Sequence, residues 1–325
     1  MISVSSVKKI KILTTEDTEI TEKQKLMFTR PQIACLICAL LLIPCAFGQT
    51  VRVDPAYQQS FDKWKAELVE GRRKNWLPLA GLFWLKPGTN TFGTDNGNAI
   101  VFPKGPAKAG SFELSGTDVT LKLSPGTQAT IQGKPVTTAK LEPDTSKDRT
   151  VVEMGSLRFH VIVRGQRIGI RLKDLESDAV RNYKDPVFFP LNLTYHVSAK
   201  WVPSDGKKTV DVPNVLGDVE PVTSAGTAVF EIDGKKFELT DLGGDPTQGL
   251  SFVFSDLTTK TDTYPGGRFL DTDAVSNGTV VLDFNEAYSP PCSVTPYATC
   301  PLAPKENRLT VAIPAGEKFD RHNHP

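Results

Sequence analysis

The sequence predicts a mainly β fold, an antiparallel barrel or sandwich with one N-terminal helix packed on it. Glycine and proline account for 25 and 24 of the 325 residues, and they separate many short apolar runs. Within these runs apolar and polar residues alternate, which is the pattern of half-buried strands. A single segment near residue 55 shows helical spacing instead.

The expected helix begins at Pro55 and ends near Gly71. Asp54 can accept hydrogen bonds from the first turn, and proline suits the first helical position. Glycine commonly marks a helix end. The large apolar side chains that recur at helical spacing are Tyr57, Phe61, Trp64 and Leu68.

Beyond the helix we expect strands and hairpins. Asp233-Gly234 is a strong two-residue hairpin turn. The clearest hairpin runs from 157–164 to 167–172 around Gly165-Gln166. The other expected strands are 99–102, 119–123, 150–154, 227–232 and 236–239.

Two histidines fall on the polar faces of expected strands. His160 alternates with the apolar positions of 157–164, and His196 does so in 195–201. Neither has a metal ligand or catalytic partner at a recognisable spacing, so a surface or cross-strand packing role is the favoured interpretation.

Residues 1–48 are expected to lie outside the fold. The apolar run 33–43 follows Arg30 and leads to Ala46-Phe47-Gly48, which is typical of a signal peptide. A start at Met27 would give ordinary proportions, so 1–26 is interpreted as an over-called start. The run is too short to span a bilayer, so we expect export to the periplasm or medium and no stable membrane span after cleavage. An uncleaved anchor or a lipoprotein is the alternative.

Cleavage after Gly48 would leave Cys292 and Cys300 as the cysteines of the mature chain. In an oxidising compartment two cysteines eight positions apart in a loop are expected to form a disulfide. A metal or reactive-thiol role is the alternative. We expect a single β-rich domain over 49–320, followed by a tail at 321–325.

Charge and motifs exclude several function classes. The formal net charge is +1, and no basic stripe supports a nucleic-acid partner. No phosphate-binding glycine loop, nucleophile elbow or zinc motif is present, so no metal and no cofactor is expected.

The segment 282–318 has an unusual density of polar and aromatic residues in one proline-rich loop. Asp283 and Asn285 alternate onto one face of a strand that leads into it. Prolines and a disulfide would make the loop rigid, which suits the wall of a binding site. A buried network that only fixes the loop would use the same residue types. The candidate ligand-binding residues are Arg268, Asp283, Asn285, Tyr288, Tyr297, Asn307 and Arg308.

Binding of a small polar, carbohydrate-like ligand is the favoured function, because no nucleophile signature is present. Such a ligand needs aromatic surface and a few hydrogen-bond donors. A hydrolase that uses Asp283 with Glu286 or Glu317, or His160 with a carboxylate, is the first alternative, and a structural protein is the second.

The same segment, together with Trp76 to Gly93, Val187 to Trp201 and Gly266 to Leu270, resembles the uncharacterised family called domain of unknown function 1684. The resemblance extends from about Trp64 to Lys318. It implies a single family-sized unit and no particular activity.

Overall fold

The computed structural model describes residues 53–320, and the expectations for 1–48 and for the tail 321–325 lie outside these residues. The mainly β prediction is confirmed, and the sandwich form fits because no sheet of the described chain closes into a barrel. The expected domain 49–320 stays a prediction. No helix between residues 53 and 320 is long and apolar enough to cross a membrane.

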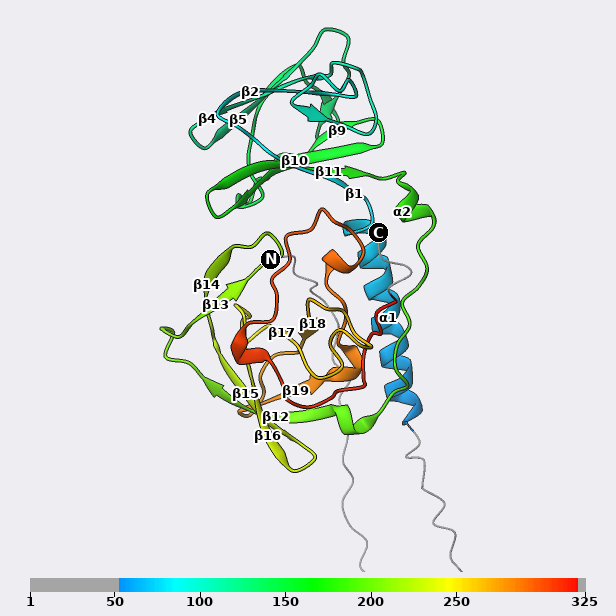
Figure 1. Cartoon of the computed structure of the whole chain (residues 1–325), viewed down its shortest axis with the longest axis vertical. Coiled ribbons are helices and arrows are strands. Elements are labelled where there is room, and N and C mark those ends of the chain that lie inside the picture. The colour runs from blue at the N-terminus through cyan, green and yellow to red at the C-terminus, as the bar shows by residue number, and fades with distance from the viewer. Residues whose placement is uncertain (1–52, 321–325) are drawn as a thin grey trace, which may run out of the picture. The chain divides into compact units, whose positions relative to one another are not determined.

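Two sheets pack around a first core (Figure 1). Phe92 and Phe112 from one sheet meet Phe159 and Ile170 from the other. The six-stranded sheet has the order β1 (Leu79–Trp84), β11 (Arg167–Asp174), β10 (Leu157–Arg164), β9 (Val152–Met154), β6 (Thr130–Ile131) and β7 (Lys134–Pro135). The five-stranded sheet has the order β3 (Ile100–Val101), β2 (Gly88–Gly93), β4 (Gly110–Ser115), β5 (Asp118–Leu123) and β8 (Thr138–Leu141).

A second core lies in the C-terminal part of the chain, where Phe230, Phe252 and Phe284 are buried together. Its main sheet has the order β16 (Lys235–Thr240), β15 (Gly226–Ile232), β12 (His196–Pro203) and β19 (Thr279–Asp283). Two further sheets have two strands each: β13 (Thr209–Pro213) with β14 (Val219–Thr223), and β17 (Ser251–Phe254) with β18 (Arg268–Asp271). The short helices are α2 (Asp178–Arg181), η1 (Leu193–Tyr195), η2 (Phe284–Glu286), η3 (Pro291–Ser293) and η4 (Lys305–Asn307).

The predicted turn and helix both form. Asp233 and Gly234 have φ values of 51° and 72°, as a two-residue hairpin turn requires. The helix α1 spans Pro55–Asn75, and the Asp54 side chain accepts a hydrogen bond from the amide of Ala56. It continues past Gly71, where Arg72 is buried in an ion pair with Glu317. The helix is therefore longer than predicted, because Glu317, which is distant in sequence, stabilises its last turn through Arg72.

Candidate functional site

Asp283 is the centre of a polar cluster at the end of β19. Antiparallel pairing places it opposite His196, the first residue of β12, and His196 Nδ1 lies 3.0 Å from its carboxylate. The Tyr57 hydroxyl of α1 donates to the same carboxylate at 2.8 and 3.0 Å. The cluster therefore joins the helix to two neighbouring strands.

Asn285 connects this carboxylate to the chain before β12. Its amide nitrogen donates to Asp283 Oδ1 and to the Asn192 carbonyl, both at 3.0 Å, and its Oδ1 accepts from the Asn192 amide. Asp283 and Asn285 do meet, but not by strand alternation, because β19 ends at Asp283 and Asn285 lies in η2, which the Asp283 side chain caps. Asn285 is 1% exposed, so it positions its neighbours and is closed to a ligand.

An open hollow of about 550 Å³ lies beside this cluster. Asn192 belongs to both, because it lines the hollow while Asn285 holds its backbone. The remaining wall is largely apolar and consists of Phe189, Pro190, Leu191, Leu193, Thr194 and Pro314.

The carboxyl groups of Asp283 and Glu286 have opposite pKa shifts. Burial alone would raise the pKa of Asp283, but hydrogen bonds from His196 and Tyr57 outweigh it and hold the pKa below the ordinary 3.8. Burial, followed by repulsion from Asp283 and Asp273, raises the pKa of Glu286 to about 8. At neutral pH Asp283 is therefore an acceptor and Glu286 a proton donor.

His196 is the accessible member of the cluster. Its side chain is 42% exposed, against 12% for Asp283. The hydrogen bond to Asp283 raises the pKa of His196 above 6.5. With Nδ1 directed to the carboxylate, Nε2 is the nitrogen that can exchange a proton with a bound molecule.

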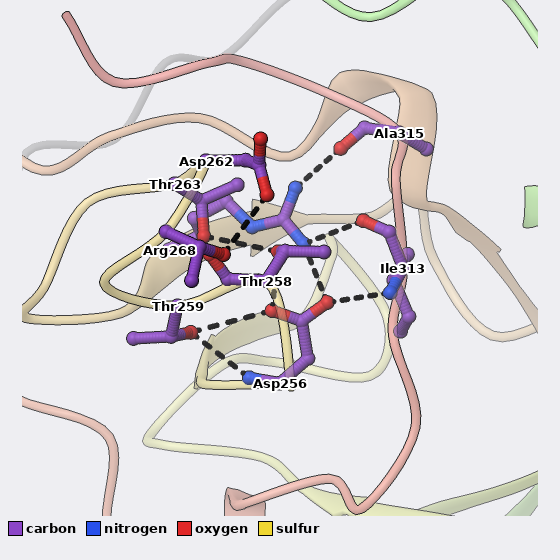
Figure 2. A network of polar contacts seen from close by, with 9 residues as sticks. Asp256, Thr258, Thr259, Asp262, Thr263, Arg268, Ile313 and Ala315 are labelled. Atoms are coloured by element: carbon purple, nitrogen blue, oxygen red, sulfur yellow. Dashed lines mark hydrogen bonds and ion pairs between the residues drawn. The ribbon is translucent and has the colours of Figure 1, made fainter.

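Arg268 does not join this cluster and lies in a separate network with Asp256, Ile313 and Ala315 (Figure 2). It is 1% exposed and donates to Asp256 Oδ2 at 3.2 Å and to the carbonyls of Ile313 and Ala315. Asp256 also accepts from the amide of Ile313 and from the hydroxyl of Thr258, each at 2.7 Å. Arg268 thus fixes the C-terminal segment 313–315 to the loop after β17.

Asn307 and Arg308 are also away from Asp283. Asn307 is fully buried, accepts from the amide of Thr240 and donates to the carbonyls of Thr240 and Val253, so it bridges β16 and β17. Arg308 is exposed. The expectation that Arg268 and Arg308 form one site with Asp283 is therefore wrong. Arg268 is hydrogen-bonded to Asp256 and to buried loop carbonyls, and Arg308 faces solvent.

The two tyrosines of the loop lie apart. The Tyr288 hydroxyl donates to Asp271 at 2.6 Å, and its ring contacts Trp64 and Trp76. The Tyr297 carbonyl accepts from Arg171 of β11 at 3.5 Å. The loop thus contacts both α1 and the six-stranded sheet.

The expected disulfide is not formed in the structure. Cys292 and Cys300 are buried free thiols, and the amide of Cys292 donates to the Cys300 sulfur at 3.2 Å. The backbone holds one sulfur as a hydrogen-bond acceptor, and the two sulfurs are not at bonding distance.

Sequence reasoning missed Tyr57, Asn192 and the role of His196. Helical spacing marks Tyr57 only as an apolar position of the helix, whereas in the structure its hydroxyl donates to Asp283. The pairing of His196 with Asp283 depends on the register of two strands that are 87 residues apart. Residue spacing along the sequence cannot predict such a pair.

Comparison with known proteins agrees with the sequence resemblance in part of the chain. Residues 181–318, somewhat less than half of the chain, match the model of a family described as protein of unknown function (DUF1684). The match contains Asp283, His196 and Asn285 and excludes Tyr57. No curated protein matches the sequence.

Among solved structures, the chain is similar to an uncharacterized protein of Haloarcula marismortui studied by NMR in solution. The identity is 29%, the match covers 44% of this chain and 80% of that one, and the TM-score is 0.37. It is also similar to the complex of the FhaA FHA domain with the intracellular domain of Rv3910, with 15% identity, 28% and 97% coverage and a TM-score of 0.21. Neither TM-score is high enough to indicate a shared fold.

Proposed function

We propose that this protein binds a small polar, carbohydrate-like ligand in the hollow at 189–194. The observation that carries the proposal is the position of Asn192, which lines the hollow while Asn285 ties its backbone to Asp283. Phe189 offers an aromatic wall for the apolar face of a sugar. His196 is not part of the lining, but it follows the lining residue Thr194 by two positions and is the exposed polar group of the cluster. Sites of this kind combine apolar walls with a few fixed polar groups.

The ligand proposal is tested by ligand-observed NMR with a panel of monosaccharides, disaccharides and sugar acids, followed by titration calorimetry. Asp283→Asn is expected to weaken binding by about tenfold, because Asn285 then loses the carboxylate that helps it hold the Asn192 backbone at the hollow. It should lower the free energy of unfolding by only about 1–2 kcal/mol. Arg308→Gln is the control, since Arg308 is exposed and outside the hollow.

Failure of the whole panel to bind would contradict the ligand proposal. An Asp283→Asn variant that does not fold would assign the cluster to stability alone.

A second candidate function is hydrolysis by general acid–base catalysis. It is favoured by the pairing of His196 with Asp283 and by the opposite pKa shifts of Asp283 and Glu286, because catalytic acids and bases are commonly separated in this way. Neutral His196 would activate water, and protonated Glu286 would donate to the leaving group.

The hydrolase candidate predicts a bell-shaped pH profile with chromogenic ester and glycoside substrates. Activity should rise as His196 loses its proton, above 6.5, and fall as Glu286 ionises near pH 8. His196→Gln should abolish it, whereas Lys200→Gln, an exposed change on the same strand, should not. Residual activity in His196→Gln at the wild-type level would exclude this role.

The same pair gives a stability signature. The pKa of His196 is raised in the folded state. Its contribution to the free energy of unfolding is therefore complete below pH 6.5, the ordinary pKa, and is lost as the pH rises through the raised pKa. The contribution of Asp283 is present above 3.8 and is lost as pH falls through its lowered pKa. Since His196 is 42% exposed, its contribution should stay below about 1 kcal/mol.

We further propose that the protein is exported and that its mature chain begins near Gln49. The support is the apolar run 33–43 with small residues after it.

In an oxidising compartment Cys292 and Cys300, which already lie close together, would form a disulfide. Mass spectrometry of the secreted chain should find the Gln49 terminus and no free thiol. Two alkylatable cysteines in unreduced protein would contradict the disulfide.

A further inference from the structure

One face of the β10–β11 hairpin is basic. The register places His160 opposite Arg171 and Arg158 opposite Lys173, on the side that alternates away from the first core. The cationic side chains of this face are Arg158, Arg164, Arg167, Arg171 and Lys173.

Carboxylates neutralise only part of this charge. The ion pairs are Arg158 with Glu153, Arg164 with Asp144 and Arg167 with Asp218. Within residues 53–320, no ion pair with a carboxylate involves Arg171, Lys173 or Arg149, which lies on the loop before β9. Arg171 and Lys173 share one face of β11, and Arg149 is close enough to repel both His160 and Lys173 electrostatically. The Lys173 ammonium also donates to the Lys74 carbonyl at 3.4 Å, so these three cations lack a carboxylate partner but Lys173 has a backbone acceptor.

The ionisation of the neighbours reflects this excess. Burial, followed by repulsion from Arg149 and Arg171, lowers the pKa of His160 to about 3, so its ring is neutral at physiological pH. Burial and the same two arginines lower the pKa of Lys173. Asp144 acts on both His160 and Arg171 in the opposite direction, since its charge favours their protonated forms.

Arg171 also has an unused donor. Its Nη2 donates to Thr299 Oγ1 at 3.3 Å and to the Tyr297 carbonyl at 3.5 Å, but its buried Nε has no hydrogen-bond partner. A buried donor of a charged group without an acceptor is unfavourable. An oxygen-rich anion would supply the missing acceptor.

We propose that Arg149, Arg171 and Lys173 bind a phosphate-type oxyanion, with neutral His160 as an additional hydrogen-bond partner. A dianion suits three cations that form no ion pair with a carboxylate, and a guanidinium presents paired donors to phosphate oxygens. Free phosphate and a phosphomonoester share this chemistry. The site uses β10, β11 and the loop at 149, so it is independent of the hollow at 189–194.

The test measures thermal unfolding and the His160 ring signals in the full chain at fixed ionic strength, with phosphate, glycerol phosphate, acetate or chloride. Phosphate or glycerol phosphate should raise Tm in a saturable way, because a ligand of the native state stabilises it. Bound anion should also raise the pKa of His160 from about 3. If only free phosphate binds, the site excludes an esterified oxygen; if both bind, it accepts a phosphomonoester.

Arg149→Gln is the first variant, since Arg149 is exposed. It should fold normally and weaken phosphate binding by about tenfold, as expected for a lost charge-assisted contact. Lys173→Gln should do the same. Lys140→Gln is the control, because Lys140 is exposed and paired with Asp118. Equal shifts with chloride, equal affinity for acetate, or full binding in both variants would overturn the proposal.

Discussion

Asp256→Ala is expected to lower the free energy of unfolding by about 3–5 kcal/mol, because it leaves the Arg268 guanidinium buried without its counter-ion. Arg268 is 1% exposed, and Asp256 carries its only carboxylate contact in the described chain (Figure 2). Asp256 also accepts from the amide of Ile313 and the hydroxyl of Thr258. Denaturant titration measures the change.

The matched control for Asp256 is Asp211→Ala, since Asp211 is exposed on β13. It should change stability by less than about 0.5 kcal/mol. A double replacement, Asp256→Leu with Arg268→Met, should recover much of the loss, because removing both charges leaves no unpaired ion. A loss below about 1 kcal/mol in Asp256→Ala would show that water reaches Arg268.

Glu317→Ala is expected to release the last turn of α1 and cost about 3–5 kcal/mol. Glu317 accepts from Arg72 Nη1 at 2.9 Å and from the amide of Ser289 at 2.7 Å. Arg72 also contacts the Tyr183 hydroxyl, and it lies over the Trp76 ring. Hydrogen exchange should therefore show lost protection in α1 and in the segment around Ser289.

Lys74→Ala is the control on the same helix, because Lys74 is exposed and its ion pair within residues 53–320 is with Glu70, one turn away. It should cost no more than about 0.5 kcal/mol. Unchanged protection of α1 in Glu317→Ala would mean that its aromatic contacts hold the helix without the ion pair.

The β-rich fold class and most helices and strands could be predicted, because they depend on residues that are close in sequence. Strand alternation predicted 157–164 and 227–232, and β10 and β15 occupy almost the same residues. Asp233-Gly234 predicted its turn from backbone preference alone. The helix start followed from Asp54 and Pro55.

The candidate site was predictable only in part. Asp283 and Asn285 are two residues apart, so local geometry brings them together. Arg268 and Arg308 have the same chemistry in the sequence, yet one is buried beside Asp256 and the other is exposed. Polar composition does not separate a ligand-binding side chain from one that satisfies buried backbone groups.

By itself the sequence determined the fold class, the positions of the main elements and the pairing of Asp283 with Asn285, because short-range periodicity and turn preference govern these. The tertiary structure alone decided which distant groups meet: His196 and Tyr57 at Asp283, Arg72 at Glu317, and the unpaired cations around His160. Strand register and helix docking fix these contacts. Both depend on how whole elements bury their apolar faces, and residue spacing along the chain does not encode that result.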